Sequence, residues 1–102
     1  MNSKQWEILE ERFTNIYKYD ETAELEAWTD GGVDMIITIN LDKDIVTELE
    51  DYIENFDIDE EIDLYRGDKE YRKVFTIRES LKDFEDWIKH IKGIIKELKE
   101  AK

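Results

Sequence analysis

The feature that most constrains the fold is a long amphipathic pattern in the last quarter of the chain. Large apolar residues repeat there at intervals of three and four, as on one face of an α-helix: Leu81, Phe84, Ile88, Ile91, Ile95 and Leu98. Ile77, Trp87 and Ile94 widen this stripe beyond the narrow seam of a coiled coil, so the helix should lie across a sheet or between helices. Thr76 and Glu79 form a capping-box pair at its start. In 102 residues so broad an apolar face predicts one domain, residues 1–102, with a single core.

The first forty residues change from a helical to a strand-like period. A helix is predicted from Ser3 to about Lys18, on the spacing of Trp6, Leu9, Phe13, Ile16 and Tyr17. Residues 23–28 and 33–40 then alternate apolar and polar side chains around Asp30-Gly31-Gly32, which predicts a β-hairpin. The second strand is the more apolar of the two, so we expect it to lie nearer the core.

The middle of the chain predicts two more helices. Asp42 can cap the first, an acidic helix running to about Asn55, and Asp57 with Glu60 suggests a capping box for a short helix that ends at Gly67. Residues 71–75 alternate weakly and form either a short edge strand or an extended segment. The expected fold is therefore α+β, with a helix, a hairpin with a possible third short strand, an acidic helix, a short helix and a long C-terminal helix.

Charge is unevenly distributed along the chain. The formal net charge is −13, and residues 42–63 alone carry eleven acids and one base, whereas residues 64–102 carry eight acids and eleven bases. Such a molecule should repel nucleic acid and anionic membranes and attract basic protein surfaces. The absence of cysteine excludes disulfides and thiolate metal sites. With no secretory h-region and no long apolar run, we expect a cytoplasmic protein that contacts no membrane.

The candidate partner-binding residues are ten carboxylates of the acidic segment, here called the acidic surface: Asp44, Glu48, Glu50, Asp51, Glu54, Asp57, Asp59, Glu60, Glu61 and Asp63. Acids near a helix C-terminus and like charges one turn apart are both unfavourable, so stability alone does not account for them. One interpretation is a solvated face, or a face turned toward the basic final helix. The other is a surface that imitates the phosphates of a nucleic acid and occupies the groove of a DNA- or RNA-binding protein.

No pattern of catalytic or metal-binding residues is found. Asp57, Asp59, Glu61 and Asp63 alternate as in a calcium loop, but Ile62 stands where an EF-hand needs glycine and is better placed as a core residue. His90, the only histidine, has no partner nearby in sequence and is expected to face solvent. There is no glycine-rich phosphate loop. We therefore expect no enzyme activity, no cofactor and no metal.

Trp28 differs from the other two tryptophans. Trp6 and Trp87 fall on apolar stripes and should be buried, whereas Trp28 falls on the polar side of the first predicted strand, beside Glu24 and Glu26. It is either covered by a helix, which we expect, or partly exposed as an anchor for a partner, since tryptophan is enriched at binding hot spots.

Two stretches in the second half of the chain carry a resemblance to a known class of proteins. They are Phe56-Asp57-Ile58-Asp59-Glu60-Glu61-Ile62 and Thr76-Ile77-Arg78-Glu79-Ser80-Leu81-Lys82-Asp83. They resemble a pattern in small acidic accessory proteins of phages and conjugative elements of low-GC bacteria, although Glu61-Ile62 replaces a histidine often found there. The resemblance implies a mobile-element protein, and anti-restriction and anti-CRISPR proteins from such elements are often small and acidic. That implication is an analogy.

Together these patterns predict a non-catalytic acidic module that binds a basic protein surface, in its most concrete form a nucleic-acid mimic that inhibits a DNA- or RNA-binding protein. Direct binding of nucleic acid is not expected. The alternative is a small structural or assembly domain, for example a homodimer joined through the final helix.

Overall fold

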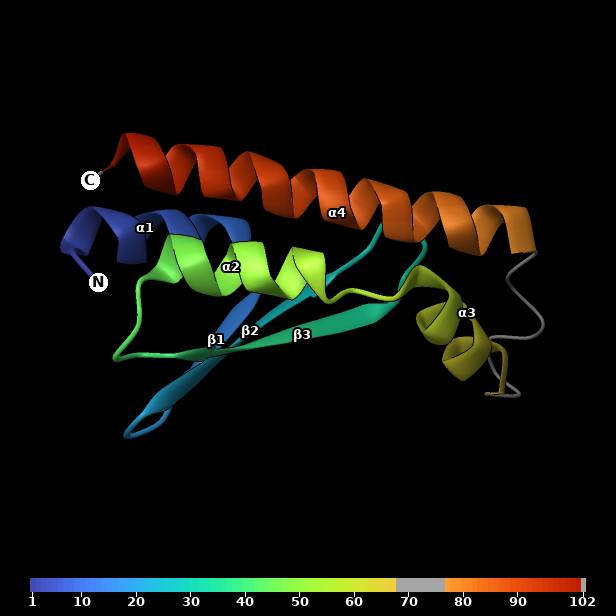
Figure 1. Ribbon diagram of the computed structural model, residues 1–102, viewed down its shortest axis with the longest axis horizontal. Coiled ribbons are helices and arrows are strands. Elements are labelled where there is room, and N and C mark those ends of the chain that lie inside the picture. Colours follow the sequence, from blue (N-terminus) through green and yellow to red (C-terminus); the bar gives the residue numbers. More distant parts are fainter. Residues whose placement is uncertain (68–76, 102) are drawn as a thin grey trace.

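The computed structural model describes residues 1–67 and 77–101. Within them, four helices accompany a three-stranded sheet, as Figure 1 shows. In chain order these are α1 (Ser3–Arg12), β1 (Asn15–Lys18), β2 (Thr22–Trp28), β3 (Asp34–Asn40), α2 (Ile45–Glu54), α3 (Ile58–Gly67) and α4 (Ile77–Glu100). The α+β class and the long C-terminal helix predicted from the sequence are confirmed.

The sheet is antiparallel in the order β1-β2-β3, so β2 is central. Leu25 of β2 lies between Ile16 of β1 and Ile37 of β3. The predicted hairpin is confirmed, and Thr29 N–H donates to the Val33 carbonyl across its turn at 2.9 Å. Gly32 has φ +85, a left-handed conformation that glycine adopts without a steric penalty. The second hairpin strand is not nearer the core than the first, because both bury every alternate residue and β3 forms the sheet edge.

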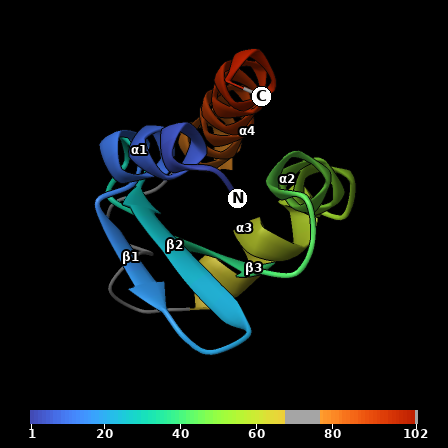
Figure 2. The ribbon, with the colours of Figure 1, turned by 90° about the vertical axis from the view of Figure 1, so that its left-hand side faces the viewer.

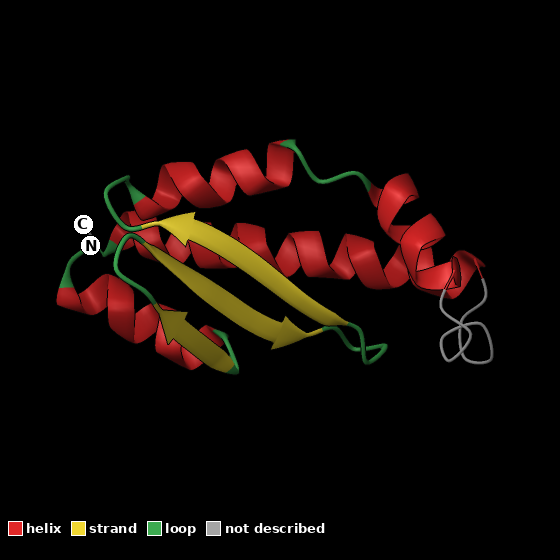
Figure 3. Ribbon diagram, turned by 90° about the horizontal axis from the view of Figure 1, so that it is seen from below, coloured by secondary structure: helices red, strands yellow, loops and turns green. Residues whose placement is uncertain are grey.

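Helices α1, α2 and α4 lie on one side of the sheet, whereas α3 lies beyond its end and packs on α4 (Figure 1). Figure 2 shows α4 above the sheet and between α1 and α2, and Figure 3 shows the strands in front of the helices when the molecule is seen from below. One core cluster fills the space between these elements. Its largest fully buried side chains include Leu9, Leu25, Ile37, Leu49, Phe84, Ile91 and Leu98. No described element covers the opposite face of the sheet.

The predicted first helix is wrong beyond Arg12. At Phe13 the backbone becomes extended, with φ −112 and ψ 143, and the Phe13 side chain turns into the core. The segment that follows, residues 15–18, pairs with β2 instead of continuing the helix. The spacing of Phe13, Ile16 and Tyr17 fits a helix, but in the strand only Ile16 faces the core, beside Leu25, while Tyr17 turns to the other side of the sheet.

The other boundaries need smaller corrections. Asp44, not Asp42, caps α2: its carboxylate accepts from the Thr47 amide at 3.2 Å, while Lys43 N–H closes a turn on the Asn40 carbonyl. The third strand is formed by residues 15–18. The possible strand at 71–75 and the cap at Thr76 lie outside the described residues.

The apolar stripe of α4 faces the core as predicted. Phe84, Trp87, Ile91, Ile94 and Leu98 are all buried, whereas Leu81, near the start of the stripe, is 38% exposed. Within the described part of the chain, no helix combines the length and apolar character needed to span a membrane.

Candidate functional site

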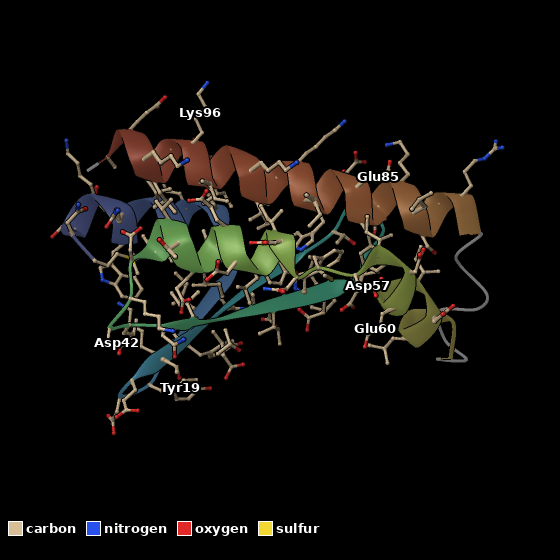
Figure 4. All side chains as sticks on the ribbon, in the orientation of Figure 1. Tyr19, Asp42, Asp57, Glu60, Glu85 and Lys96 are labelled. Carbon is tan, nitrogen blue, oxygen red and sulfur yellow. The ribbon has the colours of Figure 1, made fainter. Side chains whose placement is uncertain are left out.

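The structure places the acidic surface on the outer sides of α2 and α3. Eight of its ten carboxylates are exposed, and Glu48 and Glu61 are half-buried. Figure 4 labels Asp57 and Glu60, which lie at the beginning of α3, at the end of the molecule opposite the chain termini. The prediction that these residues lie largely in solvent is therefore confirmed for most of them.

Four members of the acidic surface have partners within the chain. Asp44 caps α2, and Asp57 caps α3 by accepting from the Glu60 amide at 3.1 Å. Glu48 turns back toward the sheet and accepts from the Asn40 amide at 2.5 Å. Glu50 lies 3.9 Å from the Lys99 ammonium, in a pair whose two side chains are about half exposed. A pair of this kind contributes little to stability.

The other six carboxylates make no ion pair or side-chain hydrogen bond with any residue whose side chain the structure describes, a set that leaves out residues 65–77. They are Asp51, Glu54, Asp59, Glu60, Glu61 and Asp63. Burial raises the pKa of Glu61, and the nearby charges of Glu60 and Asp57 raise it further. The negative charge of the two helices is therefore left largely unneutralised by the part of the chain that the structure describes.

The interpretation of the acidic segment as a face turned toward the basic final helix holds only in part. Helix α2 packs beside α4, and a groove of about 270 Å³ between them is lined by Glu50, Glu54 and Lys92 over Ile53 and Ile95. Figure 4 shows Lys96 pointing away from the rest of the molecule. The lysines of α4 thus meet only one border of the acidic surface.

Trp28 is 54% exposed, so the expectation that a helix covers it is wrong. The physical reason is that α1, α2 and α4 lie on the face that carries Ala23, Leu25 and Ala27 (Figure 2), and the alternation of β2 turns Trp28 the other way. The uncovered side, here called the open sheet face, carries Tyr17, Glu24, Glu26, Trp28, Asp34 and Ile36. Burial raises the pKa of the Asp34 carboxyl, and a hydrogen bond with Glu26 raises it further.

A pocket lies where the hairpin turn meets α4. It has a volume of about 190 Å³, and its walls include Trp28, Asp30, Asp83, Asp86, Trp87 and His90. We call it the hairpin pocket. Trp87 is buried, and its indole N–H donates to the Tyr52 hydroxyl at 2.9 Å, which fixes the ring. The His90 ring lies 5.9 Å from the Trp87 ring, and the His90 side chain is exposed as predicted.

Asp83 holds the hairpin turn against α4. Its carboxylate is 6% exposed and accepts from the Thr29 hydroxyl at 2.5 Å and from the Gly31 amide at 2.9 Å. The Thr29 hydroxyl in turn accepts from the Val33 amide at 3.0 Å. Among the described residues, Asp83 has no cation within ion-pair distance. Both ends of the hairpin turn are therefore fixed by a buried negative charge.

Sequence reasoning missed the hairpin pocket and the role of Asp83. The available signal was that Ser80, Asp83 and Trp87 follow helical spacing with the buried Ile91, which places two polar residues on the inward side of α4. Ile62, in contrast, is buried as predicted from the imperfect calcium loop. No group of three or more His, Asp or Glu residues arranged to hold a metal ion occurs in residues 1–67 or 77–101.

No protein-family model matches this chain, and neither a curated protein nor a solved structure matches it.

Proposed function

We propose that the protein is a non-catalytic binding module whose acidic surface engages the basic surface of another protein, with a DNA- or RNA-binding protein as the most concrete partner. The observation that carries this proposal is the set of carboxylates on α2 and α3, of which eight are exposed and six have no ion pair or side-chain hydrogen bond with a side chain that the structure describes. Charge of one sign concentrated on one surface accelerates encounter with a partner of opposite charge and repels partners of like charge.

The spacing of these carboxylates supports the nucleic-acid-like version. Helix α2 has ten residues, and at 1.5 Å per residue it is about 15 Å long. Its exposed acids, counted from the cap, are Asp44, Glu50, Asp51 and Glu54, or roughly one charge per 4 Å. One strand of duplex DNA carries a phosphate every ~3.4 Å. The linear density of negative charge along α2 is thus similar to that of a single nucleic-acid strand.

The alternative of an assembly domain joined through the final helix has less support. The apolar stripe that would make such a contact is used inside the chain, where α4 packs on α1, α2 and α3. A dimer through α4 would have to pair surfaces rich in charge. The resemblance of the second half of the chain to acidic proteins of mobile elements favours an inhibitory role of the anti-restriction or anti-CRISPR kind.

The test is a charge-reversal variant that leaves the internal contacts intact. Asp51→Lys, Glu54→Lys and Asp59→Lys change exposed side chains that make no ion pair or side-chain hydrogen bond with the described part of the chain. Glu48 is avoided because it binds the Asn40 amide. The matched control is Glu7→Lys, Glu10→Lys and Glu21→Lys, which alters the net charge equally at exposed positions outside the acidic surface.

Both variants and the unchanged protein are used to capture partners from a bacterial lysate at low and high salt. The proposal predicts that a partner binds the unchanged protein and the control, is lost with the acidic-surface variant, and is released by added duplex DNA. Capture should weaken as salt rises, because charges are screened over about 8–10 Å near physiological ionic strength. Partners that remain bound to the acidic-surface variant, or that duplex DNA does not displace, would contradict the nucleic-acid-like mode.

A further inference from the structure

We propose that the hairpin pocket is a binding site for an organic cation, namely a guanidinium or ammonium group. The pocket is separate from the acidic surface, since its walls come from the end of β2, the hairpin turn and the middle of α4. The inference therefore does not depend on the role of α2 and α3. It rests on the shape of the pocket, its aromatic walls and its charge.

The charge of the pocket favours a cation. Asp30, Asp83 and Asp86 all line it, and the carboxylate of Asp83 is buried. Both oxygens of Asp83 are engaged by the hairpin turn, so this residue attracts a cation through its field, whereas Asp30 and Asp86 can accept hydrogen bonds from it. The three carboxylates do not converge as metal ligands would. A larger cation with several N–H donors, or an alkylated ammonium, suits this spacing better than a metal ion does.

The two tryptophans that line the pocket offer cation–π contacts in addition to the charge of the carboxylates. Cations bind over the faces of indole rings, and the attraction is stronger where water is excluded. Trp28, which is 54% exposed, lines the pocket at the end of β2, while Trp87 contributes a wall that its hydrogen bond to Tyr52 holds in place. The same protein already shows this interaction elsewhere, since the Lys18 ammonium lies 4.2 Å from the centre of the Trp6 ring.

The volume of the pocket limits the ligand to a single head group. Sites for drug-sized molecules span roughly 300–1,000 Å³, and the hairpin pocket holds about 190 Å³. One internal cation competes at its rim, because the Lys82 ammonium lies 2.8 Å from the Asp86 carboxylate. The Lys82 side chain is 75% exposed, so an incoming cation can displace it without unburying anything.

The test follows the indole N–H signals of the tryptophans by two-dimensional NMR of the whole, ¹⁵N-labelled chain. The probes are methylguanidinium chloride and tetramethylammonium chloride, each compared with sodium chloride at the same ionic strength. We expect saturable shifts at Trp28 and Trp87, with a dissociation constant of roughly 1–10 mM for a lone head group. Trp6 is an internal reference, because Lys18 already covers its ring.

Two variants with matched controls locate the site. Trp28→Ala should weaken binding roughly 2- to 30-fold, the range that corresponds to the loss of one cation–π contact. Tyr19→Ala removes an aromatic side chain of the same 54% exposure outside the pocket and should leave the affinity unchanged. Asp86→Asn should also weaken binding, whereas Glu85→Gln, on the neighbouring exposed position of α4, should not.

The dissociation constant of a Gly-Arg-Gly peptide distinguishes two sources of the cation, a side chain of a protein partner and a free organic cation. A dissociation constant at least tenfold below that of methylguanidinium indicates a side chain of a protein partner, and equal affinities indicate a free organic cation. Either result supports the site. The proposal is overturned if neither probe shifts Trp28 or Trp87 saturably beyond the sodium chloride control, or if binding is unchanged in both Trp28→Ala and Asp86→Asn.

Discussion

Replacing Asp83 by alanine should lower the free energy of unfolding more than the loss of any other charged side chain that the structure describes. The Asp83 carboxylate is 6% exposed and accepts two hydrogen bonds, from the Thr29 hydroxyl at 2.5 Å and the Gly31 amide at 2.9 Å. A hydrogen bond to a charged group is worth about 1.5–3 kcal/mol. Removing the carboxylate also removes the free-energy cost of burying its charge. The net loss of stability is therefore smaller than the sum of the two hydrogen-bond energies. We expect a net loss of roughly 2–4 kcal/mol.

Thermal and urea unfolding measure this loss directly. For a domain near 100 residues, 1 kcal/mol shifts the melting temperature by about 4–8 °C, so Asp83→Ala should melt roughly 10–25 °C lower. Glu85→Ala is the control, because this neighbour on α4 is exposed and should change stability by no more than about 0.5 kcal/mol. Amide exchange at Gly31 should accelerate in Asp83→Ala, since its acceptor is gone.

A double-mutant cycle separates the Thr29–Asp83 bond from other effects of the change. Thr29→Val removes the hydroxyl, and Thr29→Ser keeps it and should be tolerated. Coupling between Thr29→Val and Asp83→Ala should reach about 1 kcal/mol or more if the two side chains interact. A loss below about 1 kcal/mol for Asp83→Ala, or additive effects in the cycle, would refute the view that this carboxylate fixes the hairpin on α4.

Three other predictions concern the core, metal and pH. Ile91 is fully buried, so Ile91→Ala should lose about 2–5 kcal/mol in urea unfolding. Leu81→Ala, on the same stripe but 38% exposed, should lose far less, and equal losses would mean that the wrong face of α4 is inside. Melts with EDTA and with millimolar calcium should coincide, because Ile62 is used in the core, and an upward shift with calcium would argue for a site in the acidic segment. The pKa values of Asp34 and Glu61 are raised by folding, so between its ordinary and its raised pKa each carboxyl binds more protons in the folded state than in the unfolded chain. The stability gained from this protonation is lost as the pH rises through the raised pKa. Melting temperatures should therefore rise as the pH is lowered from neutral through the raised pKa values, and Asp34→Asn with Glu61→Gln should flatten that rise; a rise of the same size in this double variant would count against the assignment.

The elements with one clear period could be predicted from the sequence. The stripe from Phe84 to Leu98 fits only a helix, and the alternation in residues 33–40 fits only a half-buried strand, and both were confirmed. Residues 13–18 could not be assigned in this way. Phe13 and Ile16 follow the helical spacing, and the strand forms because residues 15–18 pair with β2, between residues 5 to 11 positions apart, which the local pattern does not contain.

Of the candidate sites, only the acidic surface could be predicted from the sequence, because charged side chains are usually exposed to solvent. The carboxylates of residues 44–63 fall between the apolar residues of an inward-facing stripe, so they have to face water, and most of the acidic surface was placed correctly. Trp28 could not be placed, because alternation shows that it faces away from Ala27 but not which side of the sheet the helices cover. Asp83 shows the same limit, since a buried acid is tolerated only once the hairpin turn supplies its hydrogen-bond donors.

Charge and shape should act on different steps of binding. A net charge of −13 attracts any basic protein and so raises association rates without selecting among partners. Discrimination among basic partners needs a contact of matching shape. Trp28, which is exposed, and the hairpin pocket can provide such a contact. For a partner that touches both regions, the variant with Asp51→Lys, Glu54→Lys and Asp59→Lys should associate more slowly while dissociating at nearly the same rate. Trp28→Ala should instead dissociate faster and keep its association rate and its salt dependence. Surface plasmon resonance at two salt concentrations measures both rates. If Trp28→Ala slowed association and left dissociation unchanged, the pocket would belong to the charged surface and would have no selective role of its own.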